Sequence, residues 1–511
     1  MRRRIVLWSV AVGTAIFVAV AAWSIAQLRP MSLRERISGV LAARFNADVT
    51  IDALDVAVRP RLRVSGSGLT LRVKDHPELP PFISIERFWM DLGLFSMARR
   101  HVDTIHLDGL KIRVPPKDAR KTLGGPADSD SPDADRVLQP SKVIVEHLIS
   151  HDAELSFVKT KPDHRPLVFL IRDLELDKLG FDRVVPFRAV LMNPVPLGLV
   201  DARGSFGPWI KDDPAETAVQ GSYVFSDADL STIEGIHGIL TSTGSFNGRI
   251  TAIDVNGTTT TPNFNLDLGG KPLPLSTTFV AMVDGTNGTT ILRKVDAALR
   301  NTSIAASGAV TNLPGEGRHS IDLDVTISKG RIEDILALVA KSSPPLATGN
   351  VALHSAVRLP PGQTSVATRL KLDGRFGLTR MRFKGALQER VQEFSRRTQG
   401  KDVEDTVTNV ATNVRSQFAL SNGVMRITDL SFDVPGATVG LDGTWNLRDR
   451  RLALQGHLRM DASVSKAVGG FKSIFLRVVD PFFKKRGGTV LPIKIRGTID
   501  APEVGLNFRG K

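Results

Sequence analysis

The sequence predicts a mainly β protein: an N-terminal transmembrane helix followed by an elongated antiparallel β-sheet curled into a groove, with a few amphipathic capping helices. Three observations lead to this fold class. A long uncharged run lies near the N-terminus, apolar and polar residues alternate over most of the remaining chain, and only a few stretches have helical spacing. An open sheet with one apolar face must hide that face by closing, pairing or curling.

The composition excludes several classes of protein. The chain has 511 residues with 42% hydrophobic and 23% charged residues, which is ordinary for a folded protein. Cysteine is absent, so disulfides, thiolate zinc sites and cysteine nucleophiles are excluded. One tyrosine and 6% aromatic residues argue against an outer-membrane barrel with aromatic girdles. The net charge of +14 suits an anionic partner, either nucleic acid or the headgroups of a membrane.

The N-terminus favours the membrane. Arg2, Arg3 and Arg4 precede Ile5–Leu28, which is uncharged and long enough to span a bilayer. A cleaved signal peptide is the alternative, but its apolar region is usually shorter. We therefore expect residues 1–30 to be a retained inner-membrane anchor. A single pass with a cytoplasmic N-terminus and the bulk of the chain in the periplasm is the simplest topology.

The pattern divides the rest of the chain. In residues 31–116, a capping box at Ser32–Glu35 starts a short helix, and short alternating runs follow. Residues 117–141 are rich in Gly, Pro, Ser and Asp, which predicts a linker or loop. Residues 142–385 form the predicted central β-groove, and residues 417–511 a C-terminal β segment.

The clearest strand is at 319–328. Apolar residues alternate there with Asp322, Asp324, Thr326 and Ser328, so one face of the strand is apolar and the other polar. Strands are also predicted at 351–359, 367–372, 451–460 and 491–499. Asn-Gly pairs at Asn247, Asn256, Asn287 and Asn422 indicate hairpin turns. The residues expected to line the apolar interior are Ile321, Leu323, Val325, Ile327, Leu454 and Ile495.

Helical spacing is limited to a few places. It predicts a helix at 331–341 and a helical hairpin at 386–416, formed by residues 386–397 and 403–415. We expect these helices to cap the ends or rims of the sheet.

The chain carries no recognisable catalytic motif. It has no G-x-S-x-G elbow, no P-loop and no G-x-G-x-x-G sequence. His147 and His151 are four residues apart, but no glutamate follows the first, as it would in a metalloprotease helix; two solvated histidines are the better interpretation. We expect no enzyme activity, no cofactor and no metal.

One more segment, 463–483, has the pattern of a basic amphipathic helix. Its apolar residues follow one another by three or four, and basic residues surround them, which is typical of a helix at a membrane surface. A helix packed over the end of the sheet is the alternative. The residues predicted to dock on a membrane are Val464, Val468, Phe471, Phe475, Val478, Phe482, Lys472, Arg477, Lys484 and Lys485.

Several stretches resemble the AsmA-like family of Gram-negative envelope proteins, which includes the TamB and YhdP types. At the N-terminus these are the lone membrane helix and residues 47–52 and 58–66. Near the C-terminus they are residues 376–399, 430–437, 441–447 and 491–504. The resemblance covers about the first and last quarters of the chain, and residues 141–370 share only strand character. It implies an inner-membrane anchor, a periplasmic β-groove, and a part in phospholipid transport toward the outer membrane or in outer-membrane biogenesis. It implies no catalytic residues.

The expected function is therefore a β-groove that carries phospholipid toward the outer membrane. The expected partners are phospholipid, the inner membrane through the N-terminal helix, the outer membrane through the C-terminal helix, and envelope proteins, but not nucleic acid. The alternative is a structural scaffold for the assembly of outer-membrane proteins, which carries no lipid. An envelope hydrolase is disfavoured because the chain offers no catalytic site.

Overall fold

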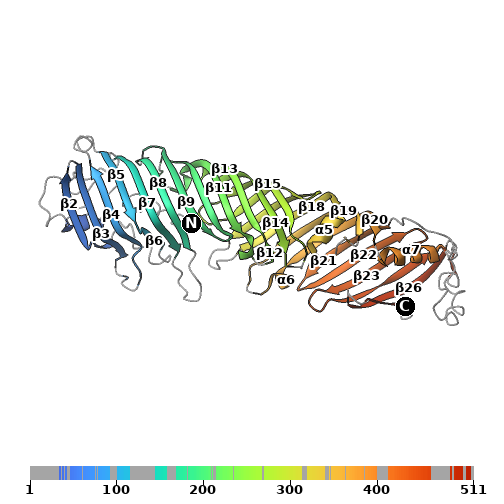
Figure 1. Cartoon of the computed structure of the whole chain (residues 1–511). Helices are drawn as coiled ribbons and strands as arrows, with labels where there is room; N and C mark the ends of the chain where they lie inside the picture. Colours follow the sequence, from blue (N-terminus) through green and yellow to red (C-terminus); the bar gives the residue numbers. More distant parts are fainter. Residues whose placement is uncertain are drawn as a thin grey trace. The chain divides into compact units, whose positions relative to one another are not determined.

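The chain is mainly β over the residues that the structure describes (Figure 1), as the alternation predicts. The structure is a computed structural model. It describes residues 34–507 with gaps, the longest at 93–100, 115–143, 158–167, 400–411 and 462–483. Strands β1–β27 and a few short helices make up the described part.

The chain divides into two compact units. Unit 1 contains residues 1–232, 240–257 and 282–287, and unit 2 contains residues 233–239, 258–281 and 288–511. Strands β14 (Ala252–Leu266) and β15 (Leu273–Val283) contribute residues to both units.

Unit 1 is a sheet closed at its start by a helix. The described residues between 34 and 42 are helical, as predicted, and Ile37 and Leu41 are buried in a core that extends to Val185. Its strands are β1 (Ala47–Thr50), β2 (Ala53–Arg59), β3 (Arg61–Val73), β4 (Ile83–Leu92), β5 (His101–Asp108), β6 (Lys111–Val114), β7 (Ile144–Phe157), β8 (Val168–Leu179), β9 (Val185–Pro194), β10 (Leu197–Phe206), β11 (Ala218–Asp229) and β13 (Ile239–Arg249).

The prediction of a purely antiparallel sheet is wrong, because the sheet is mixed. β5 and β6 both pair antiparallel with β4 and parallel with β7. Parallel neighbours need a long connection, and residues 115–143 supply its length. The polar segment 117–141 lies outside the described residues, and the strands on its two sides are direct neighbours in unit 1.

Unit 2 continues with antiparallel strands in chain order. They are β12 (Ile236–His237), β16 (Thr290–Leu299), β17 (Thr302–Asn312), β18 (His319–Arg331), β19 (Ala347–Leu359), β20 (Lys371–Phe383), β21 (Thr412–Ser421), β22 (Val424–Val434), β23 (Ala437–Asn446), β24 (Arg451–Met460), β25 (Lys484–Lys485), β26 (Gly488–Thr498) and β27 (Pro502–Leu506). β16 to β24 each pair with the next, and β26 pairs with β24, β25 and β27.

The Asn-Gly pairs predict a turn correctly at Asn422 and wrongly at Asn256. Asn422 and Gly423 both have positive φ, of 52° and 75°, and form the tight turn between β21 and β22, as predicted. Asn256 lies inside β14, so the turn predicted there is wrong.

The helices are partly as predicted. α5 (Ile332–Val339) and α7 (Ala386–Thr398) confirm the helices expected at 331–341 and 386–397. The second helix of the hairpin is wrong at residues 412–415, which belong to β21, and residues 400–411 lie outside the described part. Residues 367–369, expected to be strand, belong to the short helix α6 (Val366–Arg369). In both places the same apolar spacing fits either period, and strand pairing decides the outcome.

No helix among the described residues is long and apolar enough to cross a membrane. The predicted anchor at 1–30 and most of the predicted helix 463–483 lie outside those residues.

Candidate functional site: an apolar sheet face in unit 2

The strongest site predicted from sequence lies on β18. Ile321, Leu323 and Val325 are half-buried and Ile327 is buried, whereas Asp322 and Asp324 between them are exposed. On the polar side, the Asp322 carboxylate lies 3.3 Å from Nε of Arg358 on β19, and both side chains are 63% exposed. The two faces of this strand are therefore chemically distinct, as the alternation requires.

Strand register extends this apolar surface sideways through unit 2. Ile321, Leu323 and Ile327 pair with Leu359, Val357 and Leu353 of β19. The same in-register matching continues through β20–β24 to β26, where Leu454 and Ile495 are a direct cross-strand pair. We call this surface the apolar face; its residues are Ile321, Leu323, Val325, Ile327, Leu353, Val357, Leu359, Leu372, Phe376, Leu378, Val414, Phe418, Leu420, Met425, Ile427, Leu430, Phe432, Val439, Leu441, Trp445, Leu452, Leu454, Leu458, Leu491, Ile493 and Ile495.

The six residues predicted to line an apolar interior therefore share one face. Four come from one strand, and the other two come from strands more than a hundred residues later in the chain. Sequence alternation finds each strand's apolar side, but only the register shows that these sides form one surface.

Among the described residues, helices cover the apolar face at its two ends. α5 places Leu338 and Ile335 against Leu273, Leu299 and their neighbours. Two acids hold this helix: the buried Asp334 accepts hydrogen bonds from the Thr302 hydroxyl (3.0 Å) and the Asn301 backbone amide (3.1 Å), and the partly buried Glu333 accepts one from the Gly349 backbone amide.

α7 covers the other end of the face. Its Val391 and Phe394 pack against a core formed by residues of β22–β26. The Ser395 hydroxyl donates a hydrogen bond of 2.7 Å to the Pro435 carbonyl, which fixes the helix to the β22–β23 turn. Both helices thus act as caps, which is the role that the sequence predicts.

Between the caps, the apolar face carries side chains that are only partly covered. Leu323, Val357, Leu372 and Phe418 are each half-buried, although each belongs to a continuous apolar surface. The rings of Phe376 and Phe418 lie 6.1 Å apart. A surface of this kind normally marks a binding site, because large exposed apolar patches are rare on soluble proteins.

Polar side chains on this face are tied to the backbone. Ser355 on β19 donates to the carbonyls of Ala356 and Asp373, and Ser416 on β21 donates to those of Gln417 and Thr428. These hydroxyls are therefore already satisfied within the sheet and leave the face chemically apolar.

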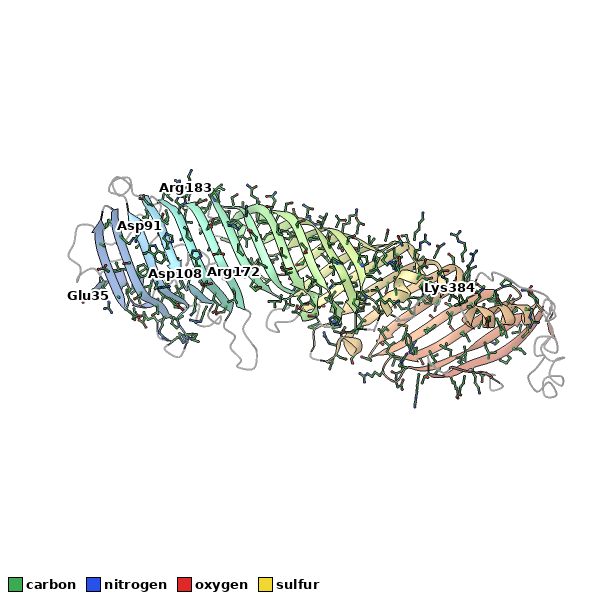
Figure 2. The ribbon with its side chains drawn as sticks, viewed as in Figure 1. Glu35, Asp91, Asp108, Arg172, Arg183 and Lys384 are labelled. Atoms are coloured by element: carbon green, nitrogen blue, oxygen red, sulfur yellow. The ribbon has the colours of Figure 1, made fainter. Side chains whose placement is uncertain are left out.

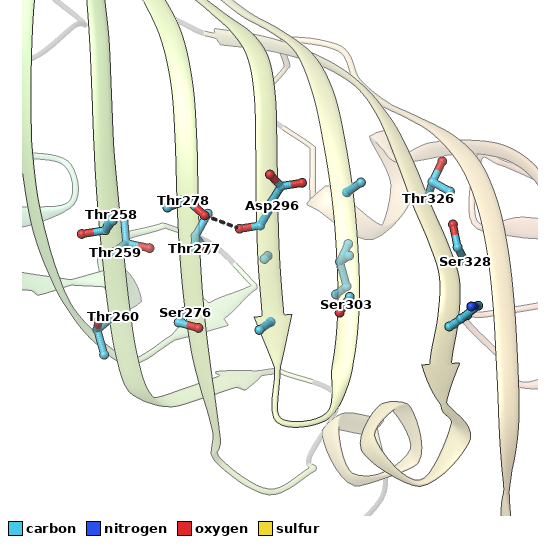
Figure 3. A pocket seen from close by; sticks show the side chains of 15 residues that line it. Thr258, Thr259, Thr260, Ser276, Thr277, Thr278, Asp296, Ser303, Thr326 and Ser328 are labelled. Carbon is cyan, nitrogen blue, oxygen red and sulfur yellow. Dashed lines mark hydrogen bonds between the residues drawn. The ribbon is translucent and has the colours of Figure 1, made fainter.

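A hollow lies on the opposite, polar face. A pocket of about 680 Å³ extends across β14–β18 within unit 2 and is lined by hydroxyl and methyl groups (Figure 3). Asp296, Ala305 and Thr326 share this face, because they are directly paired across β16, β17 and β18. Asp296 forms an ion pair with Lys294 at 2.8 Å, and their hydrogen bond raises the pKa of Lys294. The described lining of this pocket contains no histidine.

The polar face of unit 1 carries a series of cross-strand hydrogen bonds and an arginine–aspartate ion pair. His147 and His151, considered above as a metal pair, each lie 2.8 Å from an aspartate of β8, Asp177 and Asp173 respectively. Nε of Arg63 lies 2.6 Å from Oδ1 of Asp91, which is labelled in Figure 2. No group of three or more His, Asp or Glu that could hold a metal ion occurs among the described residues.

His106 lies on the same face and is stacked on Trp89, with ring centroids 4.6 Å apart. Burial lowers the pKa of His106, although nearby Asp91 acts in the opposite direction. The stacking of this imidazole on the indole stabilises the pairing of β4 with β5.

The predicted membrane-docking residues are only partly described. Val464, Val468, Phe471, Lys472, Phe475, Arg477, Val478 and Phe482 lie outside the described residues. Lys484 and Lys485 form β25, which pairs with Thr489 and Gly488 of β26. These two lysines therefore belong to a short hairpin.

The structure adds functional candidates that the sequence does not identify. Phe376, Phe418 and Trp445 join the apolar face from β20, β21 and β23. The alternation from Leu441 to Trp445 was a usable signal, but without a partner strand it does not show which surface the tryptophan joins.

Aromatic residues also gather in unit 1. Phe187 lies 6.2 Å from Phe206 and 6.5 Å from Phe246, measured between ring centroids. Phe246 rests on Gly221, where an added Cβ would lie 2.6 Å from its Cζ atom. Only a glycine permits this close approach, so the aromatic layer depends on it.

Comparison with models of known protein families, with curated proteins and with solved structures finds no match.

Proposed function

We propose that the chain is an inner-membrane-anchored periplasmic protein whose β-sheet forms an apolar groove for phospholipid, and that it moves phospholipid toward the outer membrane. The observation that carries the proposal is the apolar face of unit 2, which is continuous across strands and only half-buried between its capping helices. The N-terminal uncharged run supports the anchor.

Acyl chains match this face energetically. A methylene group gains about 0.8 kcal/mol on leaving water, so a chain of about sixteen carbons gains on the order of 10 kcal/mol when fully covered. A face made of aliphatic and aromatic side chains offers that gain without a specific polar partner. Because neighbouring strands are about 4.8 Å apart, a chain can shift from strand to strand with little change in buried area.

Two polar side chains of the face already have partners. The Ser355 and Ser416 hydroxyls bond to backbone carbonyls, so an acyl chain above them leaves neither hydroxyl unpaired. Direction of transport must come from partners or from a lipid gradient, since the sequence holds no P-loop.

Photo-crosslinking tests the proposal. A photoreactive residue placed at Leu323 of the full-length protein in membranes should capture phospholipid, and one placed at the adjacent Asp322 should not. Both positions lie on the same strand and differ only in the face that they occupy. Equal capture, or no capture at either position, would contradict a lipid-binding face and favour a scaffold that carries no lipid.

A further inference from the structure

At one end of the strands of unit 2, three connecting loops are joined to one another by hydrogen bonds. The Arg448 guanidinium, in the β23–β24 turn, donates a hydrogen bond of 3.0 Å to the Thr368 hydroxyl of α6. The Leu447 amide donates one of 2.9 Å to the Gly423 carbonyl in the β21–β22 turn. We call residues 360–370, 422–423 and 447–450 the turn rim. Since the strands are antiparallel, this rim lies at the opposite strand ends from α5 and α7.

Trp445 stands where the apolar face meets the turn rim. It is the penultimate residue of β23, and its direct cross-strand neighbours are Met425 and Leu452. Its indole Nε1 is buried and has no hydrogen-bond partner among the described residues. A buried N–H donor without an acceptor costs free energy and is rare in folded proteins. An acceptor oxygen of a bound molecule would remove this cost for the Trp445 indole.

The rim beside Trp445 is basic and exposed. Arg448 and Arg450 lie in the β23–β24 turn, and the Asp449 carboxylate between them lies 3.9 Å from Nε of Arg451, the first residue of β24. Residues 448–451 therefore carry a net charge of +2, from three arginines and one aspartate. Arginine suits phosphate because its planar fork donates two hydrogen bonds together.

We propose that the rim at Trp445 binds the polar end of an anionic phospholipid. Its acyl chains lie on the apolar face, an ester carbonyl accepts the hydrogen bond of the Trp445 indole, and its phosphate is bound by Arg448 and Arg450. Tryptophan at the border of apolar and polar surroundings plays the same part at membrane interfaces. This inference rests on the proposed function and adds where on the face the lipid's polar end lies.

The experiment uses the full-length protein with a photoreactive residue at Ile427, which lies on the apolar face of β22 two residues from Met425. The photoreactive group is on the protein, so the added compounds need no label. Capture of phosphatidylglycerol, diacylglycerol or hexadecane is measured by mass spectrometry as an increase in the mass of the protein. Two variants are compared with the parent: Trp445→Phe, which removes the N–H donor and keeps an aromatic ring, and the double change of Arg448 and Arg450 to Gln. Trp89→Phe on the polar face of unit 1 is the matched control.

The three compounds separate the contributions of the rim. Trp445→Phe should weaken capture of phosphatidylglycerol and diacylglycerol about threefold to tenfold, because both carry ester carbonyls. The arginine variant should weaken capture of phosphatidylglycerol about tenfold or more and leave diacylglycerol unchanged. Neither should alter capture of hexadecane, and Trp89→Phe should alter nothing. Inorganic phosphate should not compete.

The outcomes separate this inference from the proposed function. Capture of phosphatidylglycerol that is equal in the parent and both rim variants would overturn the assignment of the polar end while leaving an acyl-binding face in place. Competition by inorganic phosphate alone would overturn the assignment to a lipid. Failure of the parent to capture any of the three compounds would overturn the proposed function itself. Melting curves by circular dichroism identify a variant that fails to fold, and the two variants act through different residues, so one remains informative.

Discussion

Placing a charge on the apolar face should separate lipid binding from folding. Leu323→Asp introduces a carboxylate between Gly308 and Val357, the cross-strand neighbours of Leu323. Aspartate is suitable because its short side chain cannot bend its charge away from the face, as lysine can. The matched control is Ser328→Asp, which adds the same charge to an exposed position of the polar face on the same strand.

The expected magnitudes differ for folding and for binding. Leu323 is half-buried, so its loss should cost about 1 kcal/mol of stability, roughly half of the value for a fully buried leucine. In the empty protein the new carboxylate keeps its water. An acyl chain must strip that water, which should cost at least about 2 kcal/mol and weaken binding about thirtyfold.

The assay is displacement of a fluorescent fatty-acyl probe from the purified full-length protein, with thermal unfolding followed in parallel. Leu323→Asp should lose probe affinity while its melting temperature falls by a few degrees at most, and Ser328→Asp should match the parent in both. If Leu323→Asp binds the probe as tightly as Ser328→Asp does, the reasoning about this face is refuted. A loss of affinity shared equally by both variants would indicate a charge effect that does not depend on the face.

Three further predictions concern the scaffold. Asp334→Ala leaves two donors of the α5 anchor unpaired and should lower the free energy of unfolding by about 2–4 kcal/mol, measured by denaturant titration. Gly308→Ala should destabilise the protein by about 2 kcal/mol or more, because φ is +145° and the new Cβ would lie 2.1 Å from a carbonyl oxygen; Gly377→Ala, with open space around it, is the control and should cost far less. His106 has a lowered pKa when folded, so the unfolded chain binds more protons below about pH 6.5 and stability should fall as the pH drops through that value. His106→Gln should reduce this slope in unfolding titrations from pH 7.5 to 5, and an unchanged slope would exclude His106 as its source.

The period of the sequence determined the class of fold. Strict alternation in 319–328 gave β18 and its two unlike faces, and helical spacing gave α5 and α7. These predictions succeeded because side-chain direction repeats every two residues in a strand and every 3.6 in a helix, which is a local property.

Which strands pair with each other, and which parts of the sheet the helices cover, were decided only by the tertiary structure. Val414 fits either a helical stripe or a strand, and it is a strand residue because Leu378 and Phe432 pair with it from both sides. The parallel neighbours of β7 likewise depend on strands far away in the chain. Such contacts have no signature in local spacing.

The candidate site shows the same division. The sequence determined that Ile321, Leu323, Val325 and Ile327 share one face of a strand. Only the register joined them to Leu454 and Ile495, and only packing showed that helices cover the ends of the face and leave its middle half-buried. The unpaired indole of Trp445 is likewise a property of packing, because whether a buried donor finds an acceptor depends on every element around it.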